Sequence, residues 1–344
     1  MKYVVMEDVE PGQKLGKTVY SANGTVLLSA GVQLTVYMIN TLNRIGVTNL
    51  YIEDELFADV EIPELLSEQT KRAVYREMNQ AMQAVRSGKE WSTRKVSGSV
   101  DDLLKDVLNQ KDVMLQLTEI RTEDNAEYVH AINVCLISVM IGANMGLNQG
   151  QLKDLAIGAL LHDIGKSGIL HGQTDEQGKG HHTWRGFETL KNKREWNLLI
   201  AHTALQHHEK LNGTGHPRGL SGQDIHLYPR IVAIANMYDN LLGGGSGGVD
   251  VALQPHEACE RLMAASEQEL DHQALIEFTR IISIYPNGTP VRLSNKETGV
   301  VISQHRGLPS RPVIRVVRGY EGDLEIKEVD LSSETTLFIE AVLA

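Results

Sequence analysis

The chain has little cysteine, no excess of positive charge and no long apolar run, and each shortage excludes a class of protein. Its two cysteines, Cys135 and Cys259, lie in apolar helical contexts without C-x-x-C spacing. Neither a disulfide framework nor a thiolate metal site is therefore expected. Asp and Glu outnumber Lys and Arg by 44 to 33, which gives a formal charge of -11. This balance argues against binding of a nucleic-acid polymer through counterion release, so any phosphate site must be a local basic pocket.

The chain also lacks the apolar segments that direct proteins to membranes. Its first residues reach Glu7 and Asp8 too early to form the apolar core of a signal peptide. The most apolar helical stretch, residues 134–145, is too short to span a bilayer and contains Asn144. We therefore expect a soluble cytoplasmic protein without a membrane span. A length of 344 residues predicts two or three units with at least one substantial core.

The pattern along the chain predicts four units. Residues 1–60 contain β-like runs at 3–6, 17–20, 25–28 and 49–52, the turn signals Pro11-Gly12 and Asn23-Gly24, and one helix at 35–45. This pattern predicts a small α/β or β-rich module. Residues 61–118 predict a helical connector. Its first helix starts near Pro63 and stops at Gly88, and a linker over 87–99 precedes a capping box at residues 99–102.

The rest of the chain divides at about residue 285. Residues 119–285 are mainly helical, with predicted helices at 131–142, 152–162, 184–190, 196–209, 229–242 and 255–267. The glycine-rich insert at 243–248 predicts a mobile loop. In residues 286–344 the periodicity changes to two, which predicts a β-rich tail. The N-terminal module is a candidate to sense a ligand or to hold a protein partner, and its residues do not distinguish the two. The predicted fold class is mainly α, an all-helical core flanked by small N-terminal α/β and C-terminal β-rich modules.

Short histidine-containing words carry the chemistry of the helical unit. His162 and Asp163 follow an apolar helical run, and adjacent residues at a helix end can both lean toward one ion. Imidazole and carboxylate ligands suit Fe, Mn, Ni or Zn better than calcium. An isolated His-Asp pair would more simply cap a helix C-terminus. This pair is one of several such words, so the metal interpretation is preferred.

A second pair, His207-His208, ends another helical run. Two neighbouring buried histidines are hard to satisfy as neutral core groups, because each must place one N–H and one lone pair, and metal coordination resolves this. His130 and His182 complete the set of candidates. The potential ligands, none of them cysteine, are enough for a two-metal centre: His130, His162, Asp163, His182, His207 and His208. Paired metals activate a water and stabilise the attacking and leaving oxygens in phosphoester cleavage.

These ordered words resemble the HD-GYP subgroup of the HD superfamily of metal-dependent phosphohydrolases. The resemblance rests on residues 162–166 (HDIGK), 207–209 (HHE) and 212–220 (NGTGHPRGL), and it covers about residues 124–278. It implies an all-helical domain that binds two or three metal ions (iron, manganese or nickel) and hydrolyses cyclic di-GMP to the linear dinucleotide or to GMP; for this chain we expect two divalent ions, Fe, Mn or Ni. It also implies that the six residues above are metal ligands and that Asp163 bridges two metals.

The resemblance further implies a substrate-binding set. Lys166 matches the lysine near the scissile phosphate, where its point charge would offset charge that develops in the transition state. Arg185 would help to position phosphate. The remaining predicted contacts come from the loop that corresponds to the GYP motif: Gly215, His216, Pro217 and Arg218.

Three departures from the family pattern bear on activity. Asn212 and His216 replace the leading acid and the tyrosine of the GYP word. Asn236 stands where the family has a metal-binding aspartate, and it is predicted as a further metal ligand. An amide oxygen can coordinate a metal but brings no charge, so a lower metal affinity and metal number are expected. After Asp239 the family usually has a basic, aromatic-containing loop, whereas this chain has the glycine-rich insert. His171 and His181 receive no role as ligands.

The departures leave three functional hypotheses open. The first is a cyclic di-GMP phosphodiesterase. The second is a catalytically impaired member that binds a nucleotide or a protein partner and signals without turnover. The third is a phosphohydrolase of another nucleotide, such as a cyclic dinucleotide of different base composition or a nucleotide monophosphate. An all-α domain with incidental histidines would require several words to coincide in order, so it is the weakest explanation.

Overall fold

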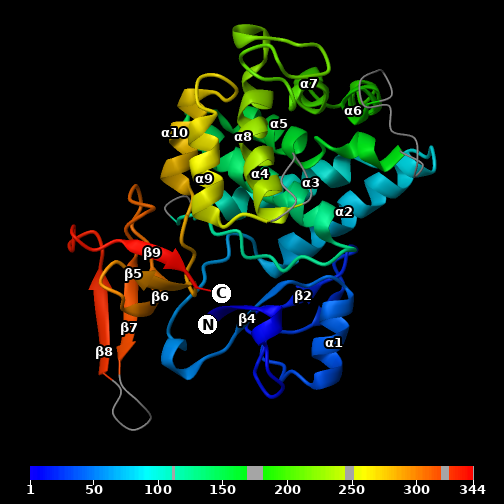
Figure 1. The fold of residues 1–344 in the computed structure, drawn as a ribbon. Helices are drawn as coiled ribbons and strands as arrows, with labels where there is room; N and C mark the ends of the chain where they lie inside the picture. The colour runs from blue at the N-terminus through cyan, green and yellow to red at the C-terminus, as the bar shows by residue number, and fades with distance from the viewer. Residues whose placement is uncertain (111–112, 169–180, 245–251, 319–324, 344) are drawn as a thin grey trace.

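A computed structural model describes residues 1–110, 113–168, 181–244, 252–318 and 325–343 of the chain. Figure 1 shows three parts over these residues: a blue N-terminal module, a helical body and an orange-to-red C-terminal sheet. The predicted fold class, an all-helical core flanked by an α/β module and a β-rich module, is confirmed. The predicted mobile loop lies outside the described residues from residue 245 onward, and so does His171.

The N-terminal module is built from four short strands and one helix. Its elements are β1 (Lys2–Val5), β2 (Val19–Tyr20), β3 (Val26–Leu28), α1 (Val36–Arg44) and β4 (Asn49–Ile52). β1 pairs antiparallel with β4, and β2 pairs antiparallel with β3. Thr35 caps α1, because its side chain accepts a hydrogen bond from the backbone N–H of Met38. Leu50 and Ile52 of β4 are buried in the core of the module.

The helical body contains nine α-helices among the described residues. They are α2 (Glu68–Arg86), α3 (Thr93–Asn109), α4 (Ala126–Asn144), α5 (Gln149–Leu160), α6 (His182–Lys191), α7 (Leu198–Gln206), α8 (Leu227–Gly243), α9 (Pro255–Ala264) and α10 (His272–Ile281). α4 packs against both α5 and α8 and forms the centre of the body. By length and composition α4 could cross a membrane, but 78% of its apolar window is buried inside the protein. The sequence analysis took the apolar stretch as residues 134–145, but the helix that contains it, α4, begins at Ala126 and has 19 residues.

Two predicted helix starts were wrong. α2 begins after Ser67, whose side chain accepts from the backbone N–H of Thr70, and not near Pro63. α3 begins after Ser92 and not at the expected capping box, because the Ser92 side chain accepts from the N–H of Lys95. Ser99 lies inside α3, where its hydroxyl donates to the carbonyl of Val96. The linker expected over residues 87–99 is correspondingly short.

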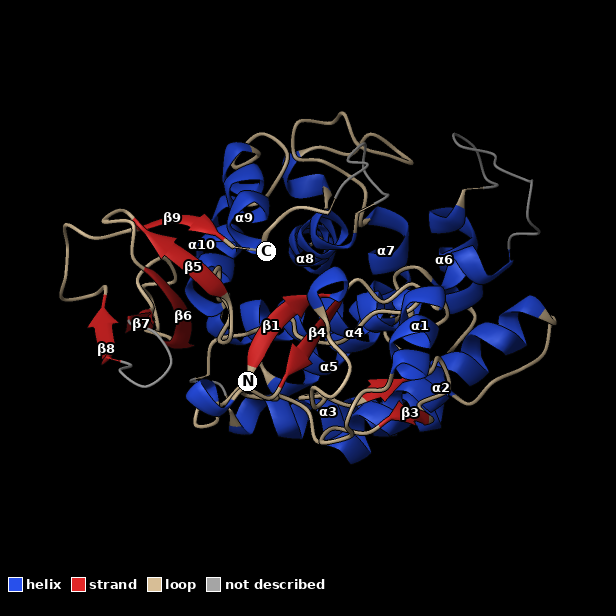
Figure 2. Ribbon diagram, turned by 60° about the horizontal axis from the view of Figure 1, so that its bottom comes forward, coloured by secondary structure: helices blue, strands red, loops and turns tan. Residues whose placement is uncertain are grey.

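The C-terminal part is one antiparallel sheet. Its strands are β5 (Pro290–Leu293), β6 (Thr298–Ser303), β7 (Val313–Arg318), β8 (Glu325–Asp330) and β9 (Ile339–Val342), in the order β8-β7-β6-β5-β9. Arg315 of β7 donates to both carboxylate oxygens of Asp59 at 2.6 and 2.7 Å, and Val300 packs against Phe57 and Val60. These contacts hold the sheet against the N-terminal module. Figure 2 shows β1 and β4 in front of the helices, with the larger sheet to their left.

Candidate metal centre and substrate cleft

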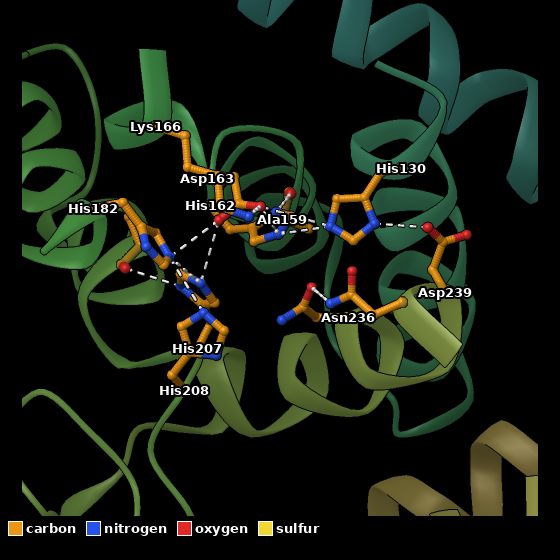
Figure 3. Close-up of polar contacts among 12 residues, drawn as sticks. His130, Ala159, His162, Asp163, Lys166, His182, His207, His208, Asn236 and Asp239 are labelled. Atoms are coloured by element: carbon orange, nitrogen blue, oxygen red, sulfur yellow. Dashed lines mark hydrogen bonds and ion pairs between the residues drawn. The ribbon is translucent and has the colours of Figure 1, made fainter. Parts of the chain in front are cut away.

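Helix ends and one glycine bring the histidine words together. His162 and Asp163 follow the last turn of α5, and His207 is the C-cap residue of α7. The short 3-10 helix at Ile164–Gly168 packs directly on α6, because a Cβ at Gly165 would lie 2.0 Å from the carbonyl oxygen of His182. The glycine of the HDIGK word therefore allows the close approach that places His182 beside Asp163 (Figure 3).

The first cluster gathers three histidines around one oxygen of Asp163. His182 Nε2 and His207 Nε2 lie 3.3 and 3.5 Å from Asp163 Oδ1. His208 Nε2 lies 3.2 Å from His182 Nε2. One ligand atom from each of these four residues falls within 4.8 Å of the others. This spacing suits a common metal ion.

The second cluster uses the other oxygen of Asp163. His162 Nε2 and His130 Nε2 lie 3.3 and 3.7 Å from Asp163 Oδ2, and the two imidazole nitrogens are 3.3 Å apart. The structure therefore brings together all six residues of the predicted ligand set, and Asp163 belongs to both clusters. A shared carboxylate is the arrangement that would bridge two ions.

The hydrogen bonds of the rings show that the two clusters fit cations. His162 Nδ1 donates to the carbonyl of Ala159 at 2.7 Å, and His207 Nδ1 donates to that of Ala204 at 2.9 Å. A neutral imidazole that donates through Nδ1 has a lone pair on Nε2. The Nε2 atoms of His162 and His207 are therefore acceptors that point into the clusters. Asp163 Oδ1 is buried with no hydrogen-bond partner among the described residues. A buried carboxylate oxygen without a hydrogen-bond partner, beside the lone pairs of imidazole nitrogens, is what a bound cation would satisfy.

The protonation states agree with this fit. Burial lowers the pKa of His207 to about 3, and burial together with neighbouring His207 holds the pKa of His208 well below its usual value. Burial alone would raise the pKa of Asp163, but His162 and Lys166 outweigh it and hold this pKa well below the usual range. Neutral imidazoles and an ionised carboxylate are the forms that bind metals.

Asp239, to which the sequence analysis gave no role, orients His130. His130 Nδ1 donates to Asp239 Oδ2 at 2.6 Å, so Nε2 of the same ring faces His162 (Figure 3). Arg121 and Asn133 donate to Asp239 Oδ1 at 2.5 and 2.8 Å. Asp239 is fully buried, and its pKa is lowered because Arg121 and His130 outweigh the cost of burial. The signal in the sequence was its position on α8, three residues after Asn236, which places both on one helix face.

Asn236 lies at the centre but has a partner of its own. Its side chain is buried on α8. Its Oδ1 accepts a hydrogen bond from Asn240 Nδ2 at 2.8 Å. The oxygen that would coordinate a metal therefore accepts from a neighbouring amide, and its role as a ligand stays a prediction.

The loop that corresponds to the GYP motif is anchored by Glu209. This buried carboxylate accepts hydrogen bonds from the backbone N–H groups of Arg218 and Leu220 at 2.8 and 3.0 Å. A Cβ at Gly215 would lie 2.3 Å from the backbone nitrogen of Lys210, so the loop can pass this close only with glycine at that position. The Arg218 side chain itself is exposed.

His216 lies next to the first cluster. Its ring stacks on His208 with centroids 4.7 Å apart and an angle of 21° between the planes, and it meets the edge of His181 at 4.8 Å. The peptide bond between His216 and Pro217 is cis. His216 thus occupies the border of the metal centre on the loop side, where a substrate contact was predicted.

Lys166 reaches the centre from the opposite side. Its Nζ lies 2.5 Å from Asp163 Oδ2, and its side chain is 45% exposed. A cation that is anchored on Asp163 and still accessible can meet an incoming phosphate. Arg185 lies on α6, the helix that begins with His182.

A cleft of about 740 Å³ opens onto the metal centre. Its volume is within the usual range for small-molecule sites. Its walls come from all three parts of the chain. From the centre outward the residues lining it include His130, Asp163, Lys166, Arg121, Asn240, Asn49 and Tyr3, with Val342 of β9 at one side. The predicted substrate contacts at 215–218 are not among the residues lining this cleft, so they would contact a substrate only from the loop side.

The fold and this site define the class of metal-dependent HD phosphohydrolases. A family model described as HD domain matches residues 102–274, which is half of the chain, and a second one, described as KOW domain associated with HD domain, matches residues 290–344. The chain therefore belongs to the HD domain family. Within it, the ordered words of the site are those of the HD-GYP subgroup, with an altered GYP word.

The relatives point the same way. The chain is 29% identical over 242 residues to a protein of Pseudomonas aeruginosa named cyclic di-GMP phosphodiesterase PA4108, over 67% of this chain and 57% of the relative. It is 34% identical over 120 residues to a protein of Vibrio cholerae named 3'3'-cGAMP-specific phosphodiesterase 3, over 33% of this chain and 26% of the relative. The chain thus spans little more than half of the first relative and about a quarter of the second.

A solved structure is also similar. It is Bd1817, described as an HDG"Y"P protein from Bdellovibrio bacteriovorus, with a TM-score of 0.47 and 16% identity, over 80% of this chain and 97% of that one.

Proposed function

We propose that this protein is a metal-dependent phosphodiesterase that hydrolyses cyclic di-GMP to the linear dinucleotide or to GMP. The observation that carries the proposal is the convergence of five imidazole Nε2 atoms on one buried carboxylate, Asp163, which has an oxygen in each of two clusters. The name of the Pseudomonas aeruginosa relative supports cyclic di-GMP as the substrate.

The proposed cofactor is a pair of divalent metal ions, with Fe, Mn or Ni as the first candidates. His182, His207 and His208 would hold one ion, His130 and His162 the other, and Asp163 both. When bound, such a pair lowers the pKa of a water and polarises the phosphoryl oxygens. Asn236, the further ligand predicted from the sequence, would add a neutral oxygen.

The side chains of the protein itself would position the substrate. Lys166, which is anchored on Asp163 and part-exposed at the mouth of the cleft, would pair with a non-bridging oxygen of the scissile phosphate. His216 on the loop side would contact the leaving half of the substrate, together with Arg185, Gly215, Pro217 and Arg218. The predictions of a protein partner on the N-terminal module and of a cytoplasmic location stay predictions.

A direct assay tests the proposal. Protein reconstituted with Mn²⁺, Fe²⁺ or Ni²⁺ should convert cyclic di-GMP to a linear product, which is separated by chromatography. Asp163→Ala should abolish conversion and metal uptake together, because both clusters lose their shared ligand. Asp102→Ala, at an exposed position of α3, is the matched control. A metal-loaded wild-type protein that forms no product within hours would contradict the proposal.

A second candidate substrate is 3'3'-cGAMP, because the Vibrio cholerae relative is named for it. The chemistry at the phosphate is the same, and only the base differs. Parallel turnover of the two cyclic dinucleotides would distinguish the candidates by their kcat/KM ratio.

Asn236 favours one further candidate, an impaired member that binds a nucleotide without turnover. Its oxygen already accepts from Asn240. In an impaired protein Asn236→Asp should create activity by adding a charged ligand, and Asn240→Ala would control for loss of the amide contact. Robust wild-type activity that does not change in Asn236→Asp would exclude impairment.

A further inference from the structure

One face of the β1–β4 pair is turned away from the core of the N-terminal module and lines the cleft. Side chains alternate along a strand, so residues directly opposite each other in the two strands share a face. Tyr3 lies opposite Tyr51, and Val5 lies opposite Asn49. Leu50, the residue between them, packs into the core of the module. Tyr3, Asn49 and Tyr51 therefore point to the opposite face, where all three line the cleft that leads to the metal centre.

This wall is held from several sides. The rings of Tyr3 and Tyr51 pack at 5.2 Å with 55° between their planes. The backbone N–H of Tyr3 donates to the carbonyl of Gly288 at 3.0 Å, which ties β1 to the segment before β5. Lys17 Nζ lies 5.4 Å from the ring centre of Tyr51. Tyr3 is only part-buried, so its ring is fixed in place and still presents surface to the cleft.

The chemistry of this wall suits a nucleobase. Aromatic faces stack on bases regardless of their sequence, and an amide offers a donor and an acceptor to a base edge. Asn49 Nδ2 donates to Thr48 Oγ1 at 2.9 Å, which orients the amide. Between this wall and the metal centre lies Arg121, a cation that is anchored on Asp239 and 29% exposed. A dinucleotide with one phosphate beside Arg121 and one base beyond it would lie along the length of the cleft.

We propose that Tyr3 and Asn49 bind the base of the nucleotide half that lies away from the scissile phosphate, so that the N-terminal module completes the substrate site. The proposal rests on the proposed function. It assigns to the N-terminal module a recognition for which the glycine-rich sequence at 243–248 offers no basic or aromatic side chain. If Tyr3 and Asn49 hold the base, binding of the dinucleotide depends on β1 and β4, whereas cleavage of the phosphodiester at the metal centre does not.

Two probes separate these roles. The phosphorothioate analogue of cyclic di-GMP measures binding by calorimetry without rapid turnover. Bis(4-nitrophenyl) phosphate, a small diester that lacks both nucleosides, measures hydrolysis at the metal centre alone. Both are used with the full-length, metal-loaded protein.

The variants are Tyr3→Leu, Tyr3→Phe and Asn49→Ala, with Asn43→Ala on the exposed face of α1 as control. Tyr3→Leu should weaken binding of the analogue by about tenfold or more, the usual effect of losing one stacking ring. Tyr3→Phe should retain binding within about threefold, because it keeps the ring. Asn49→Ala should weaken binding by a smaller factor. In these cleft variants hydrolysis of the small diester should fall far less than binding of the analogue, and Asn43→Ala should match the wild type in both measurements.

Three results would overturn the inference. The first is binding by Tyr3→Leu and Asn49→Ala that equals binding by the wild type. The second is a parallel loss of binding and of small-diester hydrolysis, which would mean that the substitutions disturb the fold. The third is a wild-type protein that cleaves the small diester but does not bind the analogue. That result would also show that the proposed substrate is wrong, whereas the first two leave the proposed function intact.

Discussion

Replacement of Asp239 by asparagine tests whether a buried carboxylate sets the form in which His130 faces the metal centre. In the wild type, Asp239 Oδ2 accepts from His130 Nδ1, while Arg121 and Asn133 donate to Oδ1. An amide in this place must keep its oxygen toward those two donors. Its NH₂ group then faces His130 Nδ1, which must become an acceptor. The ring proton moves to Nε2, and the lone pair that a metal needs is lost.

The size of the effect follows from these contacts. Loss of a hydrogen bond that orients a metal-binding histidine typically weakens metal affinity by about 10- to 100-fold. Only the cluster of His130 and His162 should lose affinity, because His182, His207 and His208 do not contact Asp239. The buried charge opposite Arg121 also disappears, so the free energy of unfolding should fall by about 1.5–3 kcal/mol, the range for one hydrogen bond to a charged group.

The assay is competition for Mn²⁺ or Ni²⁺ with a chromogenic chelator, combined with urea unfolding of the same samples. Asp239→Asn should bind one equivalent of metal with wild-type affinity and the second 10- to 100-fold more weakly. Asp102→Asn, an exposed carboxylate on α3, serves as control and should leave both affinities unchanged. A folded Asp239→Asn protein with two wild-type affinities would refute the argument that Asp239 sets the tautomer of His130.

Two further predictions concern packing and pH. Gly165→Ala should lower the free energy of unfolding by about 1–3 kcal/mol and weaken metal binding, because its Cβ would lie 2.0 Å from the carbonyl oxygen of His182. If the urea midpoint and the metal affinity are both unchanged, the close approach at Gly165 is contradicted. The metal-free protein should lose stability as pH falls below 6.5, because the unfolded chain then protonates His207 whereas the folded chain, with a pKa of about 3, does not. From pH 8 to pH 5 the loss from this one histidine is about 2 kcal/mol in urea unfolding, and equal stability at both values would mean that His207 is not neutral in the fold.

The sequence predicted the fold well wherever periodicity was strong. β4 was expected at residues 49–52 and is found there, and α1 differs from the expected range by one residue at each end. The start of α3 was missed because residues 99–102 fit a capping box, whereas the serine that caps the helix is Ser92. Ser92 precedes the apolar residues that reach the core, whereas Ser99 is itself buried in the helix.

The candidate site was predictable in its ligands but not in its surroundings. Asp163 belongs to a short word whose residue types suit metals, and the resemblance to the HD-GYP subgroup added His130, so both could be proposed without a structure. Asp239 acts through His130, and no local pattern marks a residue that touches only another side chain. The contribution of Tyr3 and Asn49 to the cleft depends on how β1 and β4 pack on the helical body, and this packing is not encoded in any one segment.

Metal content and cyclic di-GMP turnover, measured on one preparation of the full chain, test the central claim most directly. The account predicts more than one equivalent of bound divalent metal, conversion of cyclic di-GMP to a linear product, and loss of both properties in Asp163→Ala. A protein that carries its full complement of metal and yields no linear product over hours would contradict it.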